Sequence, residues 1–121
     1  MNALDWLIAA GAGGLASFAR FMIDGVVSLR TERSFPYGTF VVNVSGAILL
    51  GLLTGLALDP TDETLLGVAT IGSYTTFSTW MLETHRLSQE GDVSAAYLNA
   101  LANLLVGLAA IAVGRSIGHH L

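Results

Sequence analysis

The most unusual part of the sequence is Gly72-Ser73-Tyr74-Thr75-Thr76-Phe77-Ser78-Thr79-Trp80. It lies in the uncharged run 64–82, which is long enough to cross a bilayer, yet five of the seven residues 73–79 are serine or threonine. Polar groups in hydrocarbon are costly unless they face protein, water or an ion, and irregular backbone at that depth usually lines a cavity or an ion path. The alternative is an ordinary helix whose hydroxyls bond to its own carbonyls. The stretch alone leaves both interpretations open.

The composition of the whole chain indicates a membrane protein. Of its 121 residues, 53% are hydrophobic and only 12% are charged, whereas about a quarter of the residues of a soluble domain are charged. The length predicts a single domain, residues 1–121. The lack of cysteine excludes disulfides and thiolate metal sites, and the net charge of −4 without any lysine argues against nucleic acid as a partner. Because the sequence offers no nucleophile–base set or metal-ligand cluster, an enzyme is not expected.

Four segments are predicted to cross the membrane, and polar or charged turns separate them. The segments are residues 4–29, 35–58, 64–82 with an interruption at 72–76, and an uncharged core at 95–113. The turns are residues 30–34, 59–63 and 88–92, and in the second of them Thr61 or Asp62 is predicted to cap the next helix. Four crossings place both termini on one side. By the positive-inside rule, the distribution of the five arginines slightly favours an orientation with both termini outside the cell. With so few charges, insertion in both orientations is also possible.

Polar and small side chains inside the spans predict an internal face. Arg20 and Asp24 lie four residues apart on one helix face. Arg20 is either a functional cation within the membrane or a helix-end residue paired with Asp24. The Asn43 amide either forms a hydrogen bond to a neighbouring helix or donates a hydrogen bond to a permeating anion. Asn99 and Asn103 share one face of the last span and suggest a polar track.

Glycines at positions 46, 51 and 55 are predicted to form a packing face on the second span, since small residues let helix backbones approach closely in lipid. The pair at 51 and 55 has the small-xxx-small spacing. That spacing is a weak signal alone.

Several linked motifs resemble the small fluoride channels of prokaryotes, the Fluc or CrcB family, over essentially the whole chain. They are the glycine-rich run before Arg20, Phe35-Pro36-Tyr37-Gly38-Thr39, Val42-Asn43-Val44-Ser45-Gly46, and Thr75-Thr76-Phe77-Ser78-Thr79 followed by Glu83. The resemblance implies an all-α membrane protein with four transmembrane helices, the third of them broken. It implies an antiparallel, dual-topology dimer in the prokaryotic inner (plasma) membrane, with two pathways for passive fluoride efflux. The implied partners are fluoride, a sodium ion at the dimer interface, membrane lipid, and a second subunit that is identical or related.

The resemblance also assigns roles to individual residues. Backbone carbonyls of Gly72 and Thr75 are expected to hold the sodium ion. The expected fluoride pathway residues are Asn43, Phe77, Trp80, Thr76, Thr79, Asn99 and Asn103. Aromatic ring edges are positive, so Phe77 and Trp80, three residues apart, can face an anion if the helix resumes after its break. Arg20 is expected in an entrance vestibule, where a cation concentrates anions.

Four positions depart from the family pattern. Trp80 stands where a second phenylalanine is usual, and Ser73 stands where a second glycine is common. Asn99 and Asn103 occupy places where tyrosine and serine are frequent. Because some members of the family work only as pairs of non-identical subunits, the departures leave both a homodimer and a heterodimer open.

Two other function classes compete with the channel. A small dual-topology multidrug antiporter has a similar size and span number, but it needs an ionisable carboxylate deep in the first helix, where this chain has only Arg20 and Asp24 near the far end. A structural or assembly subunit would have no use for the hydroxyl-rich interruption. The channel is therefore the leading prediction, with the antiporter as its alternative.

Overall fold

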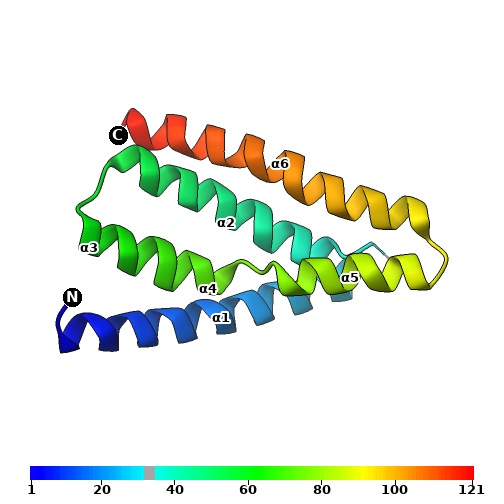
Figure 1. The fold of residues 1–121 in the computed structure, drawn as a ribbon, viewed down its shortest axis with the longest axis horizontal. Coiled ribbons are helices and arrows are strands. Elements are labelled where there is room, and N and C mark those ends of the chain that lie inside the picture. The colour runs from blue at the N-terminus through cyan, green and yellow to red at the C-terminus, as the bar shows by residue number, and fades with distance from the viewer. Residues whose placement is uncertain (32–34) are drawn as a thin grey trace.

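The computed structural model describes residues 1–31 and 35–121, and all regular elements in these ranges are helices. Three of them are long and apolar enough to cross a membrane: α1 (Ala3–Thr31), α2 (Tyr37–Leu56) and α6 (Val93–His119). In the chain, α2 and α6 are connected by a column of shorter helices, called here the third column. It consists of α3 (Pro60–Glu63), the π-helix η1 (Thr64–Ile71), α4 (Gly72–Tyr74) and α5 (Ser78–Gln89). Figure 1 shows both termini at the same end of the bundle.

The predicted segments correspond to these columns with modest shifts at their ends. Within the predicted loop 30–34, Arg30 and Thr31 still belong to α1, while Glu32, Arg33 and Ser34 lie outside the described residues. The common end of the two termini agrees with the predicted even number of crossings.

The interruption of the third column lies later in the chain than predicted. Gly72 keeps helical torsion angles (φ −60°, ψ −35°), and α4 continues to Tyr74. Thr75 is extended (φ −77°, ψ 162°), and α5 begins at Ser78. The break therefore occupies residues 75–77 rather than 72–76, because it occurs where side chains, and not a glycine, take over the backbone N–H groups.

Aspartates outside the long helices begin two of the elements. Asp59 accepts a hydrogen bond from the backbone N–H of Asp62, with Pro60 in the first turn, so Asp59 caps α3 in place of the predicted Thr61 or Asp62. This hydrogen bond lowers the pKa of the Asp59 carboxyl. Asp92 caps α6 in the same way, through the N–H of Ala95.

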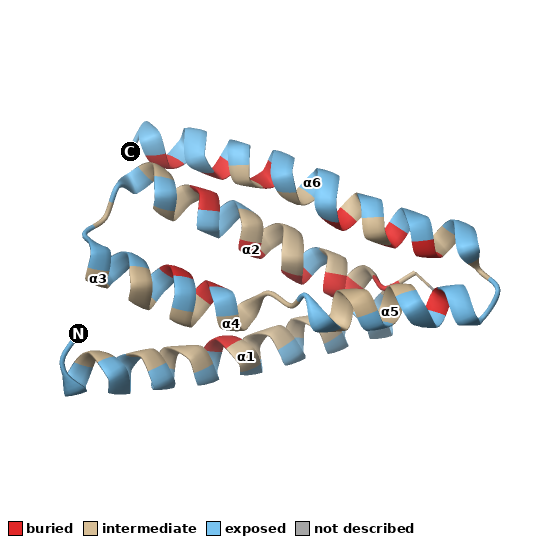
Figure 2. Cartoon of the chain, viewed as in Figure 1, coloured by how far each residue is buried: buried red, intermediate tan, exposed pale blue. Residues whose placement is uncertain are grey.

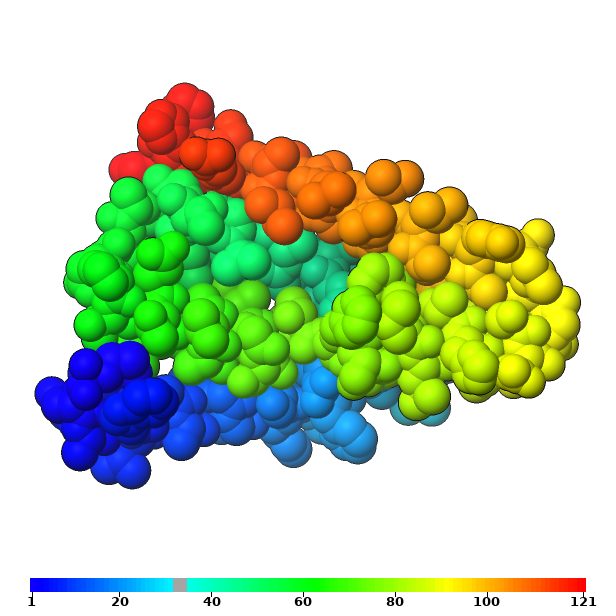
Figure 3. Space-filling model, in the orientation of Figure 1, coloured from blue at the N-terminus to red at the C-terminus, as the bar shows by residue number. Residues whose placement is uncertain are grey.

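Glycines bring α2 and α6 into backbone contact at Gly51 and Gly55, as the spacing on the second span predicted, whereas Gly46 faces Thr75 and Tyr74 of the third column. A Cβ atom on Gly51 would lie 2.2 Å from the carbonyl oxygen of Ile111, and one on Gly114 would lie 2.1 Å from the carbonyl oxygen of Ile48. Such close approach is typical of helix packing in lipid. In Figure 3, α6 lies directly on α2, whereas the third column contacts α6 along α5.

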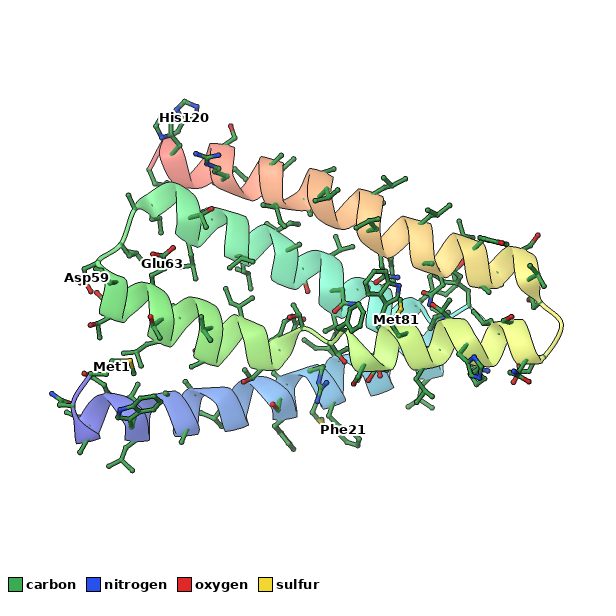
Figure 4. All side chains as sticks on the ribbon, in the orientation of Figure 1. Met1, Phe21, Asp59, Glu63, Met81 and His120 are labelled. Carbon is green, nitrogen blue, oxygen red and sulfur yellow. The ribbon has the colours of Figure 1, made fainter. Side chains whose placement is uncertain are left out.

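Polar side chains are buried inside the bundle. Its largest fully buried side chains are those of Leu87, Val42, Asn99 and Thr39, two of them polar. Large apolar side chains instead face outward, and Phe21 on α1 points away from the bundle with 73% of its surface exposed (Figure 4). Figure 2 shows the exposed outer faces running along every column. This arrangement suits a protein surrounded by lipid and directs attention to its polar interior.

Candidate functional site: the break in the third column

The side chain of Asn43 on α2 occupies the backbone groups at the break. The N–H of Thr76 donates to Asn43 Oδ1 (2.9 Å), and Asn43 Nδ2 donates to the carbonyl of Thr76 (3.1 Å). In an unbroken helix the same N–H would bond to the carbonyl of Gly72, four residues earlier. The Asn43 side chain thus takes the place of the helical hydrogen-bond partner of Thr76.

A second diversion follows on the other side of the break. The N–H of Thr79 donates to Thr76 Oγ1 (3.1 Å), whereas helical geometry would direct it to the carbonyl of Thr75. The carbonyls of Gly72 and Thr75 both lose their helical donors in this way. These are the two carbonyls that the family resemblance assigned to sodium.

Three asparagines form a continuous chain of hydrogen bonds, called here the amide ladder: Asn43, Asn103 and Asn99. Asn43 Nδ2 donates to Asn103 Oδ1 (3.2 Å), and Asn103 Nδ2 donates to Asn99 Oδ1 (3.1 Å) and to the Asn99 carbonyl (2.8 Å). Asn99 Nδ2 in turn donates to Thr84 Oγ1 (2.8 Å). The predicted shared face of Asn99 and Asn103 is confirmed, and both side chains are buried.

The aromatic pair predicted from the three-residue spacing is present at the start of α5. The rings of Phe77 and Trp80 lie edge to face, with centroids 5.5 Å apart and planes at 86°. Phe77 is 69% exposed, whereas the indole N–H of Trp80 donates to the carbonyl of Asn99 (3.1 Å). The indole N–H therefore already has a partner inside the chain.

A groove of about 830 Å³ runs between α2, the third column and α6. Of the predicted site residues, it is lined by Asn43, Gly72, Thr75, Thr76, Phe77, Trp80 and Asn103. Apolar side chains such as Leu50 and Leu108 make up much of the remaining lining, and Glu63 points toward α2 at the end near the termini (Figure 4). Most of the predicted site residues therefore line one groove on one face of the bundle.

A smaller cavity of about 160 Å³ lies on another side of the break. It is lined by Arg20, Phe21, Asp24, Thr39, Val42, Thr76 and Thr79. Thr76 borders both spaces. In the described parts of the chain Arg20 and Asp24 form no ion pair, so the pairing considered from their spacing is not seen.

Two contacts at this site were missing from the sequence-based set of residues. Thr39 on α2 donates to the Glu83 carboxylate on α5, which ties the two columns together beside the smaller cavity. Thr84 accepts from Asn99 and donates to the carbonyl of Trp80 (2.9 Å). A hydroxyl four residues after Trp80 was the one available signal for Thr84, since that spacing places both on one helix face.

These features are those of an all-helical, multi-pass membrane protein with a polar break in one helical column. The chain belongs to the family described as "CrcB-like protein, Camphor Resistance (CrcB)", which matches residues 6–115. It is 49% identical over 112 residues to "Fluoride-specific ion channel FluC 2" of Mycolicibacterium paratuberculosis, covering 93% of this chain and 92% of the relative. It is also 39% identical over 121 residues to "Fluoride-specific ion channel FluC 1" of Symbiobacterium thermophilum, covering 95% and 98%. The family inferred from the motifs is confirmed.

Proposed function

We propose that this chain is a subunit of a fluoride-selective channel that lets fluoride leave the cytoplasm passively. The observation that carries this function is the helix break, where threonine hydroxyls and the aromatic rings of Phe77 and Trp80 border one groove. A permeating anion must replace its hydration shell with protein donors. Relatives named as fluoride-specific channels support the choice of anion.

The pathway in this proposal passes the groove residues at the break. Thr76 supplies a hydroxyl donor there, while Phe77 and Trp80 supply positive ring edges without a competing charge. Thr79 lines the smaller cavity instead of the groove, so its hydroxyl could serve only on that side of Thr76. Asn43 and Asn103 border the same groove, although their N–H groups are hydrogen-bonded within the subunit. Asn99 lines neither of the two cavities, so its predicted place in the pathway has no supporting contact.

We further infer that a second subunit, antiparallel to the first and identical or related to it, covers the groove. An open, largely apolar groove inside a membrane protein is suited to such a partner. Sodium would sit on the dimer axis, held by the carbonyls of Gly72 and Thr75, because both have lost their helical donors and no carboxylate is needed for a monovalent cation. Water-like density at this position in an experimental map would contradict the sodium site.

Fluoride efflux from liposomes that contain only this purified chain tests the function. Selective, passive efflux of fluoride over chloride is expected. Absence of fluoride efflux together with proton-coupled export of organic cations would instead favour the small multidrug antiporter. If neither activity is seen, adding a related subunit tests whether the channel requires two different chains.

Removing the charge of Arg20 should reduce fluoride flux more at low ionic strength than at high. Arg20 lines the smaller cavity beside Thr79, and a cation there concentrates anions through a field that salt screens over about 10 Å at 0.1 M. Arg20→Gln keeps a polar side chain of similar reach. Flux measured at two salt concentrations decides the matter, since equal losses at both would indicate a packing role.

Trp80→Phe should preserve selectivity for fluoride over chloride while lowering thermal stability. Phenylalanine retains a ring edge near Phe77, but it cannot donate to the Asn99 carbonyl as the indole does. An interhelical hydrogen bond in a membrane protein contributes about 0.6 kcal/mol on average, so the stability loss should be small. The efflux rate should rise if the larger indole obstructs the groove. Trp80→Ala with unchanged flux and selectivity would place residue 80 outside the pathway.

A further inference from the structure

Asn99 is fully buried and lines neither cavity, yet each polar group of its side chain is used. Its Oδ1 accepts from Asn103, and its Nδ2 donates to Thr84 Oγ1 and to the carbonyl of Trp80. Because the Asn99 amide contacts only protein groups, any role it has must pass through the residues to which it is hydrogen-bonded.

The hydroxyl of Thr84 fixes the direction of the amide ladder from the α5 end. The Thr84 hydroxyl donates a hydrogen bond to the Trp80 carbonyl, so it can only accept a hydrogen bond from Asn99. The Nδ2 atom of Asn99, and not its Oδ1, must therefore face Thr84. Asn99 Oδ1 is then turned toward Asn103, which directs Asn103 Nδ2 to Asn99 and Asn103 Oδ1 to Asn43.

The backbone at the break fixes the same ladder from its other end. The N–H of Thr76 can only donate, so Asn43 Oδ1 must face it and Asn43 Nδ2 must point to the Thr76 carbonyl and to Asn103. Both ends thus require the same donor direction through three side chains. A buried network in which every member is satisfied holds its groups in one arrangement.

We propose that Asn99 is a positioning residue that acts through Asn103 to hold the Asn43 amide on the Thr76 peptide. Without that acceptor oxygen, Asn103 Nδ2 keeps only the backbone carbonyl of Asn99 as its partner. The Asn103 amide is then held less firmly, and so is the Oδ1 that accepts from Asn43 Nδ2. The break, and Phe77 that follows it, would then no longer be fixed relative to α2. The consequence for fluoride rests on the proposed function, whereas the positioning itself does not.

The asparagine content of the chain allows a direct spectroscopic test. The sequence has only four asparagines, Asn2, Asn43, Asn99 and Asn103, so labelling the intact protein with ¹⁵N-asparagine gives four side-chain NH₂ pairs, assigned by single substitutions. Asn99→Leu should shift the Asn43 pair, although no hydrogen bond joins the two side chains. If Asn99→Leu does not assemble, Asn99→Ser takes its place. An Asn43 pair that stays at its wild-type position overturns the inference.

Fluoride-to-chloride selectivity separates positioning from simple helix packing. Asn99→Leu should lower this ratio by about three- to twentyfold, the range that interhelical hydrogen bonds in membrane proteins span. The double variant with Asn103→Leu should lose no more than Asn103→Leu alone, because Asn99 acts through Asn103. The matched control is Leu87→Ala, which opens a cavity at a fully buried α5 position outside the ladder and should lower thermal stability with the ratio unchanged.

Equal selectivity losses in Asn99→Leu and Leu87→Ala, or additive losses in the double variant, would overturn the role of Asn99. If wild-type protein carries no fluoride at all, the proposed function fails, and the Asn43 resonance still decides whether Asn99 positions that amide.

Discussion

Replacing Asn43 by aspartate should nearly abolish fluoride efflux while the protein still assembles. One carboxylate oxygen can still accept from the N–H of Thr76, but the other would face the Thr76 carbonyl and Asn103 Oδ1, both of them acceptors. The fixed charge would also repel fluoride in the groove. Two unit charges about 4 Å apart interact by roughly 4 kcal/mol at an effective dielectric constant of 20, which corresponds to about a thousandfold in rate.

A neutral variant separates this repulsion from the lost hydrogen bonds. Asn43→Leu removes the same amide without adding a charge, so it should lower flux less than Asn43→Asp in the same liposome assay. Size-exclusion chromatography of each variant checks that assembly is retained. Wild-type flux in Asn43→Asp would remove Asn43 from the pathway, and equal losses in both variants would assign its role to holding the break alone.

The spans and the aromatic pair could be predicted because their signals are local. Uncharged runs give the columns directly, and the three-residue spacing of Phe77 and Trp80 is enough to place their rings on one face of a resumed helix. Asn99 and Asn103 likewise share a face because they are four residues apart. Local periodicity does not say which neighbour that face meets. It therefore could not show that Asn99 lies behind the groove while Asn103 borders it.

The position of the break could not be predicted in the same way, because its cause is distant in sequence. Gly72 was the local candidate, since glycine weakens helices, yet it remains helical. The N–H that fails to continue the helix belongs to Thr76, and its acceptor is Asn43, 33 residues earlier on α2. The packing of α2 against the third column and α6 therefore decides where the third column opens.

That packing depends on glycines, and Gly114→Ala should accordingly weaken both stability and flux. A Cβ atom at Gly114 would lie 2.1 Å from the carbonyl oxygen of Ile48 and 2.9 Å from the N atom of Leu52. Both are main-chain atoms that cannot turn aside, so α2 and α6 must separate. Overpacking of this kind costs about 1–3 kcal/mol and occasionally more.

The loss of flux in Gly114→Ala follows from the two helices that it separates. Asn43 lies on α2 and Asn103 on α6, so moving these helices apart lengthens the hydrogen bond between the two amides that borders the groove. Gly14→Ala is the matched control, because a Cβ atom there meets nothing within 4 Å and alanine favours a helix by about 1 kcal/mol. Thermal unfolding in detergent and fluoride efflux should both decline in Gly114→Ala and remain near wild type in Gly14→Ala. A fall in stability with full, selective flux would show that the break keeps its geometry without close contact between α2 and α6.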